Sequence, residues 1–184
     1  MKSPFFLKIS STIVILSIFL SACGSAANLA QSNLGRVTSP DAPADDIHTL
    51  TEGNNAFALE LYQSLRSQDG NLIYSPYSIS VALAMTYAGA RGETEAQMAQ
   101  TMHFLPQDQM HPALNALDLE LASRGEAQSE DETPLQLNIA NAIWAKQGLP
   151  LRQDYLDVIA QNYGAGIQLA DFARQYDAVR KEIN

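Results

Sequence analysis

Cysteine is almost absent from this sequence. The single cysteine, Cys23, has no partner within the chain, so a framework of internal disulfides is excluded. Basic residues are also few, since 11 Lys and Arg stand against 20 Asp and Glu and leave a net charge of −9. A surface with this excess of acid does not attract nucleic acid by charge. We therefore expect no nucleic-acid partner.

Motifs of common catalytic and cofactor sites are missing as well. The sequence contains no Gly-x-Ser-x-Gly, no phosphate-binding loop and no dinucleotide fingerprint. Its histidines, His48, His103 and His111, are scattered, without cysteines or paired carboxylates at the spacing of metal ligands. We interpret them as surface or loop histidines and expect neither a metal nor a cofactor. Because no nucleophile–base pair is evident, the chain is not expected to be an enzyme.

Residues 1–22 have the pattern of a bacterial lipoprotein signal peptide. A short basic start precedes the apolar run 9–20, which is too short and too rich in hydroxyl groups for a membrane span. The run ends in Leu-Ser-Ala-Cys, which resembles the lipobox, where the cysteine thiol takes a diacylglyceryl chain. We expect export and a lipid anchor at Cys23, in the cell envelope, facing the periplasm or the outside. The alternative is an ordinary export signal with an incidental cysteine.

Residues 23–46 are rich in Ala, Ser, Asn, Pro and Asp and show no apolar periodicity. They contain too little apolar side chain to offset the conformational entropy that ordering would cost. We interpret this segment as a flexible tether that holds the folded part, residues 47–184, away from the lipid.

The folded part is organised around residues 76–88, where nearly every side chain is apolar or small. The hydroxyl of Ser75 can cap a helix, and Pro76 suits the first helical turn. A helix that is apolar all round has no face for solvent, so we expect it to lie inside a sizeable domain. Gly89 offers a left-handed end for this helix.

Apolar periodicity predicts further helices over residues 47–66, 92–105, 108–124 and 151–163, and the start of another near residue 178. Gly164 is expected to end the helix before it. Strands are predicted at 135–145 and 167–172. Because the first of these is apolar on both faces, we expect it to lie within a sheet that is covered on both sides.

Three stretches resemble the serpin family: Asn71 with Ser75-Pro-x-Ser-Ile-Ser, Gly89–Thr94, and Leu137–Trp144. The resemblance covers residues 47–184 and corresponds to about the first half of a serpin domain. It implies an α+β fold in which helices surround β-sheets, here with several helices and strands of the main sheet.

The resemblance also implies a function for the complete protein. A serpin traps a serine or cysteine protease as a suicide substrate, when its cleaved reactive-centre loop inserts into the main sheet. The loop and its reactive bond lie beyond the matched half, so we expect both to be absent from this chain. The alternative is a non-inhibitory serpin or a surface-anchored binding module. Heparin binding is not expected, because Arg124 is a lone base near Asp118 and Glu120.

The resemblance assigns structural roles to a few polar residues. Ser75 and Ser78 match the family's shutter positions, where hydroxyls hydrogen-bond beneath the central strands. The residues alone also allow a simpler interpretation, a helix cap and a helix serine bonded to its own backbone. Asn71 and Asn141 are expected to be buried amides with structural roles, which requires hydrogen-bond partners for both.

The lipid anchor at Cys23 is directly testable. Radiolabelled palmitate should enter the wild-type protein and should not enter Cys23→Ser, because the substitution removes the thiol that accepts the lipid. Equal labelling of both proteins, or no labelling of the wild type, would contradict the anchor.

Overall fold

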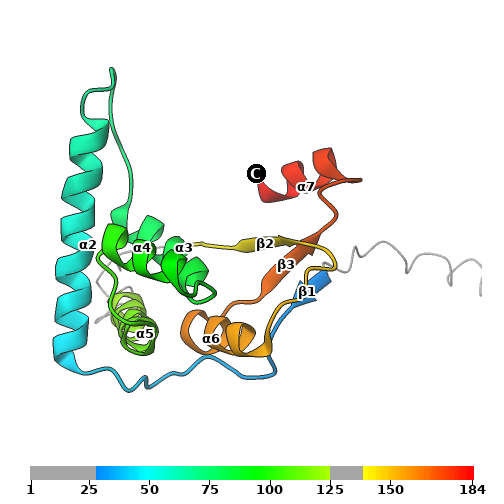
Figure 1. Cartoon of the computed structure of the whole chain (residues 1–184), viewed down its shortest axis with the longest axis horizontal. Helices are drawn as coiled ribbons and strands as arrows, with labels where there is room; N and C mark the ends of the chain where they lie inside the picture. Colours follow the sequence, from blue (N-terminus) through cyan, green and yellow to red (C-terminus); the bar gives the residue numbers. More distant parts are fainter. Residues whose placement is uncertain (1–27, 125–138) are drawn as a thin grey trace, which may run out of the picture.

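The computed structural model describes residues 28–124 and 139–184 (Figure 1). The predictions for the signal peptide, for Cys23 and for the start of the strand at 135–145 lie outside these residues. The described elements, in chain order, are β1 (Asn28–Ala30), α2 (Ala44–Leu65), α3 (Pro76–Tyr87), α4 (Glu93–Met102), α5 (Gln107–Ser123), β2 (Ile143–Lys146), α6 (Gln153–Tyr163), β3 (Ile167–Ala170) and α7 (Tyr176–Ile183). No helix among them is both long and apolar enough to cross a membrane.

Helices α2 to α5 and the strands lie on different sides of the structure. Helices α2 to α5 pack together on one side, and the small sheet lies on the other with α6 beneath it (Figure 1). The strand order is β1-β3-β2, so β3 is the central strand. β1 runs antiparallel to β3, with Leu29 opposite Gln168, whereas β2 runs parallel to β3, with Trp144 opposite the same residue.

Helix α3 is buried as the sequence predicts. Ser75 is its N-cap, and the Ser75 hydroxyl accepts a hydrogen bond from the Ser78 N–H at 3.2 Å. Pro76 occupies the first turn, where its missing N–H costs nothing. Thr86 is the one exposed position of the helix. A helix without a solvent face is stable here because neighbouring elements cover the rest of it.

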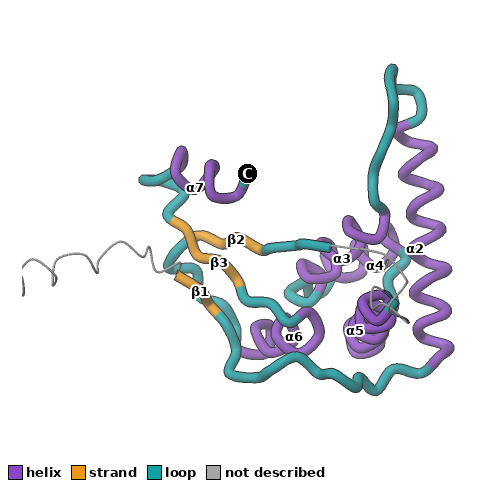
Figure 2. Tube along the Cα trace, turned by 180° about the vertical axis from the view of Figure 1, so that it is seen from behind, coloured by secondary structure: helices purple, strands orange, loops and turns teal. Residues whose placement is uncertain are grey.

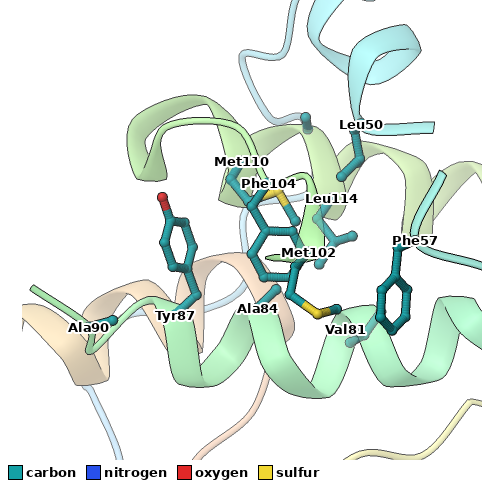
Figure 3. Packing of buried hydrophobic residues seen from close by; sticks show 11 residues of the cluster. Leu50, Phe57, Val81, Ala84, Tyr87, Ala90, Met102, Phe104, Met110 and Leu114 are labelled. Carbon is teal, nitrogen blue, oxygen red and sulfur yellow. The ribbon is translucent and has the colours of Figure 1, made fainter. Parts of the chain in front are cut away.

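The main hydrophobic core forms where α2, α4 and α5 cover α3. Figure 3 shows side chains of these helices converging on Ala84, which has no exposed surface. The Tyr87 and Phe104 rings pack at a centroid distance of 5.3 Å. The other buried members of this cluster are Leu50, Phe57, Val81, Ala90, Met102, Met110, Ala113 and Leu114. A second cluster, in which Met85 and Ala88 meet Ile159, joins α3 to α6.

The tether prediction is wrong for residues 28–37 and for residues 44–46. Asn28–Ala30 forms β1, and α2 begins at Ala44, three residues before the predicted helix. Ser32 is buried and donates a hydrogen bond to Asp157 at 2.5 Å. Backbone pairing with β3 and polar contacts order this segment, and neither requires apolar side chains.

The strand at 135–145 is predicted too long and too deeply buried. Residues 139–142 are not in a strand, and β2 covers only Ile143–Lys146. Within the described sheet β2 is an edge strand, and its side chains are half-buried or exposed.

Gly89 does not adopt the predicted left-handed conformation, since α3 ends at Ala88 in the right-handed helical region. Gly164, by contrast, ends α6 with a φ of 61°, as predicted.

Helices α2 and α4 approach so closely that Gly53 is required at their contact. A Cβ atom at residue 53 would lie 2.5 Å from the carbonyl oxygen of His103. We expect Gly53→Ala to lower the free energy of unfolding by about 1–3 kcal/mol, although alanine has the higher helix propensity. The added Cβ would force the backbone of α2 or of residue 103 to move. Chemical denaturation of the complete protein measures the change. Gly35→Ala is the control, since a Cβ there meets no atom within 4 Å; equal effects would contradict the packing argument.

Candidate functional site

A cavity of about 150 Å³ lies between α3, α5, α6 and the segment that precedes β2. Its polar wall includes Arg36, Tyr77, Asp118 and Asn141, and apolar side chains such as Met85 form the rest. The cavity therefore lies between the helices and the segments that lead into β2 and β3. It is the place where the described part brings a predicted site residue, Asn141, together with residues that the sequence did not single out.

Asn141 and Asn71 are both predicted to be buried amides, and only Asn141 has a buried amide nitrogen. Asn141 is half-buried, and its Nδ2 atom is buried without a hydrogen-bond partner among the described residues. Asn71 is exposed, so its prediction as a buried amide is wrong. Asn71 lies in the connection between α2 and α3, where Ile73 is also 94% exposed. No described element covers this connection closely enough to bury the amide.

Ser75 and Ser78 lie together at the start of α3. Their hydroxyl oxygens are 3.0 Å apart, and the Ser75 hydroxyl caps the helix. The capping interpretation is confirmed. Within residues 28–124 and 139–184 neither hydroxyl bonds to a strand, and the shutter role of both serines stays a prediction.

A polar stripe on α5 is the feature that sequence reasoning missed. It consists of His111, Asn115 and Asp118, which follow one another at spacings of four and three residues. This spacing places them on one helix face, beside the apolar residues that cover α3. The helical spacing of these polar residues was the available signal. Asn115 is only 1% exposed although its side chain is polar, so it requires partners.

Arg36 supplies partners for two residues of the stripe. Its Nε donates to Asn115 Oδ1 at 2.9 Å, and its terminal nitrogen donates to Asp118 at 2.6 Å. The Tyr77 hydroxyl donates to the other oxygen of Asp118 at 3.4 Å. Burial, and then the negative charge of Asp118, raise the pKa of Tyr77 above its usual range. Tyr77 therefore remains a neutral hydrogen-bond donor in the cavity wall.

His111 is buried, so its prediction as a surface or loop histidine is wrong. It is 3% exposed, and its Nδ1 lies 2.7 Å from the hydroxyl of Tyr163. Its Nε2 has no partner among the described residues. Burial, and then the positive charge of Arg91, lower the pKa of His111 to about 4. The imidazole is therefore neutral at ordinary pH and packs beside Tyr87 as a small aromatic ring.

The other two histidines are on the surface, as predicted. His48 lies on α2 with its Nδ1 3.5 Å from Glu52, and the Nε2 of His103 lies 3.1 Å from Glu60. In the part of the chain that the structure describes, no group of three or more His, Cys, Asp or Glu side chains could hold a metal ion.

Burial of His111 predicts a loss of stability in acid. The unfolded chain binds a proton on this residue near pH 6.5, whereas the folded chain does so only near pH 4. The stability that the neutral His111 ring contributes to the folded state is therefore complete above pH 6.5, and it is lost as the pH falls to 4. We expect the free energy of unfolding to fall by about 3 kcal/mol over this window, at 1.36 kcal/mol per pKa unit.

Chemical denaturation at pH steps from 7 to 4 measures this loss. His111→Gln should show a smaller fall across the window than the wild-type protein. His48→Gln is the control and should retain the wild-type dependence, because His48 is exposed. An unchanged pH dependence in His111→Gln would refute the role given to this residue.

Known proteins resemble this chain in sequence. A family model described as Serpin (serine protease inhibitor) matches residues 52–184. Leukocyte elastase inhibitor A of Mus musculus is 36% identical over 137 residues, which make up 73% of this chain and 34% of that protein. An uncharacterized serpin-like protein of Thermococcus kodakarensis is 30% identical over 186 residues, with 94% of this chain and 42% of the relative covered.

A solved structure resembles this chain in fold. The crystal structure of Serpin48, described as a highly specific serpin in the insect Tenebrio molitor, matches with a TM-score of 0.56 at 22% identity. The match covers 73% of this chain and 35% of that structure. The predicted α+β fold is thus confirmed, and the chain spans between a third and a half of the length of these curated relatives. On the match over residues 52–184, this chain belongs to the serpin family.

Proposed function

We propose that the complete protein inhibits a serine or cysteine protease by trapping it as a suicide substrate. The observation that carries this proposal is the family match over residues 52–184, together with relatives that are named elastase inhibitors. The protein would not be an enzyme, because the bond-breaking chemistry belongs to the protease that it traps. Its partner would be that protease, bound through a reactive-centre loop.

The described part would serve as the scaffold on which trapping takes place. Inserting a strand into a sheet gains main-chain hydrogen bonds along its whole length, and this gain drives the transition. The sheet must move over a support that does not itself rearrange. Helix α3 suits this role, since its start is capped by Ser75 and its side chains are fixed in two hydrophobic clusters.

A lipid anchor at Cys23 and a place in the bacterial cell envelope remain part of the proposal. The Leu-Ser-Ala-Cys sequence at positions 20–23 supports both. An anchored inhibitor would protect the surface of the cell from proteases that reach it. The palmitate experiment on Cys23 tests the anchor independently of any inhibition.

Inhibition is tested by incubating the complete protein with elastase-like, trypsin-like and cysteine proteases. We expect at least one protease to form a complex that survives SDS, because the trapped acyl-enzyme is covalent. The same protease, with its nucleophile chemically blocked beforehand, is the control and should form none.

Thermal unfolding after cleavage of the loop gives a second measurement. Cleaved protein should unfold at a higher temperature than intact protein, because the inserted strand adds a full set of main-chain hydrogen bonds. No SDS-stable complex with any of these proteases, combined with no gain in thermal stability, would instead indicate a non-inhibitory serpin or a binding module.

A further inference from the structure

Residues 28–37, which we call the N-terminal latch, contact three elements far along the chain. Figure 2 shows the chain leaving β1 and passing under α6 and α5 to the start of α2. The latch pairs with β3 at one end and bonds to α6 and α5 at the other. A segment that was expected to be free is therefore attached along its length.

The first attachment closes the outer edge of β3. β1 pairs antiparallel with β3 over three residues, and β2 occupies the other side of β3. Gly166, just before β3, gives β1 the space to approach. A Cβ atom there would lie 2.9 Å from Leu29 Cδ1 and 3.2 Å from the carbonyl oxygen of Ala30. Without β1, this edge of β3 would present unpaired N–H and C=O groups.

The second attachment lies on α6. The Ser32 hydroxyl donates to Asp157 and at the same time accepts the N–H of Leu34 at 3.0 Å. Further along, the N–H of Val37 donates to the carbonyl oxygen of Gln161 at 2.8 Å. These bonds hold the latch along the helix that precedes β3.

The third attachment is the ionic one, on α5. Arg36 bonds to both Asn115 and Asp118, and Asn115 Nδ2 donates back to the carbonyl oxygen of Val37 at 2.8 Å. The buried amide of Asn115 thus binds the side chain of one latch residue and the backbone of the next. Because Arg36 and Asp118 are both charged, this attachment is an ion pair, which the other two attachments are not.

We propose that the N-terminal latch closes the outer edge of the sheet as one cooperative unit, and that breaking its Arg36 attachment opens β3 to pairing with a second copy of this chain. Order at β3 then depends on a contact made on α5. An open strand edge is a ready template for a strand from another molecule, and an identical copy carries the β1 sequence that already fits β3.

Amide hydrogen exchange in the complete protein tests the coupling. Arg36→Ala should speed exchange of residues 167–170 roughly tenfold, the effect of losing a hydrogen bond to a charged group. Arg124→Ala is the matched control. Arg124 directly follows α5, pairs with Glu120 of α5 at 2.9 Å and does not touch the latch. Equal exchange at β3 in the two variants would overturn the proposal.

A disulfide staple separates latch opening from general loss of folding. Leu29 and Gln168 are directly opposite across an antiparallel pair, where Cα distances suit a disulfide. The test variant combines Leu29→Cys and Gln168→Cys with Arg36→Ala, and Cys23→Ser removes the remaining thiol. Amide exchange of residues 167–170 should be slow when the disulfide is formed and fast when it is reduced. Fast exchange in the oxidised form would show damage beyond the latch and refute the proposal.

Light scattering after size-exclusion chromatography tests the partner. Arg36→Ala should form dimers or larger oligomers as its concentration rises, and the oxidised staple should abolish them. If Arg36→Ala stays monomeric although β3 exchanges rapidly, the second copy is refuted as the partner. These results do not depend on protease inhibition, so failure of the latch and failure of the proposed function can be told apart.

Discussion

Burial of α3 is the constraint on which the rest of the described structure depends. The helix has almost no solvent face, so each neighbour must supply apolar cover. Helices α2, α4 and α5 cover one side. On the other side, Ile159 of α6 and Ile143 at the start of β2 pack against Met85 and Ala88. Each large apolar side chain buried in this way contributes about 1.5–3 kcal/mol. Displacing one neighbour therefore exposes part of α3 and weakens the packing of the others.

Local signals in the sequence predicted most of the helices. The buried helix, its Ser75 cap and the left-handed end of α6 at Gly164 follow from residues within a few positions of each other. Gly89 shows the limit of such signals, because a glycine permits a left-handed conformation without requiring one. The chain after α3 instead turns with Ala88 in the right-handed region, and the Gly89 N–H bonds to Thr86.

Each feature that the sequence did not reveal depends on partners far along the chain. Arg36 and Asp118 are 82 positions apart, and Ser32 and Asp157 are 125 positions apart. No periodicity links such residues, and a polar segment without apolar side chains looks unstructured whether or not its partners exist. His111 is a similar case, because its burial follows from Tyr163 and Tyr87 on other helices. Helical spacing indicated a polar face on α5 but not what that face contacts.

The latch changes what a lipid anchor would do to this protein. With a tether over residues 23–46, an extended chain could hold the folded part roughly 80 Å from the lipid. Since β1 begins at Asn28, five residues after Cys23, an extended chain between the two spans at most about 18 Å. An anchor at Cys23 would therefore hold the edge of the sheet near the membrane surface.

That distance is a little more than two Debye lengths, of about 8 Å each, at physiological ionic strength. Residues 1–22 contain Lys2 and Lys8 and no acid, so a chain anchored at Cys23 would carry a net charge of −11. Anionic headgroups would repel such a chain, and salt would weaken this repulsion at the full extension of the segment. Any pull transmitted from the lipid would reach β1 first. The bonds of Ser32 and Arg36 to α6 and α5 lie beyond β1 along the chain, so they would resist the release of the latch even if β1 separated from β3.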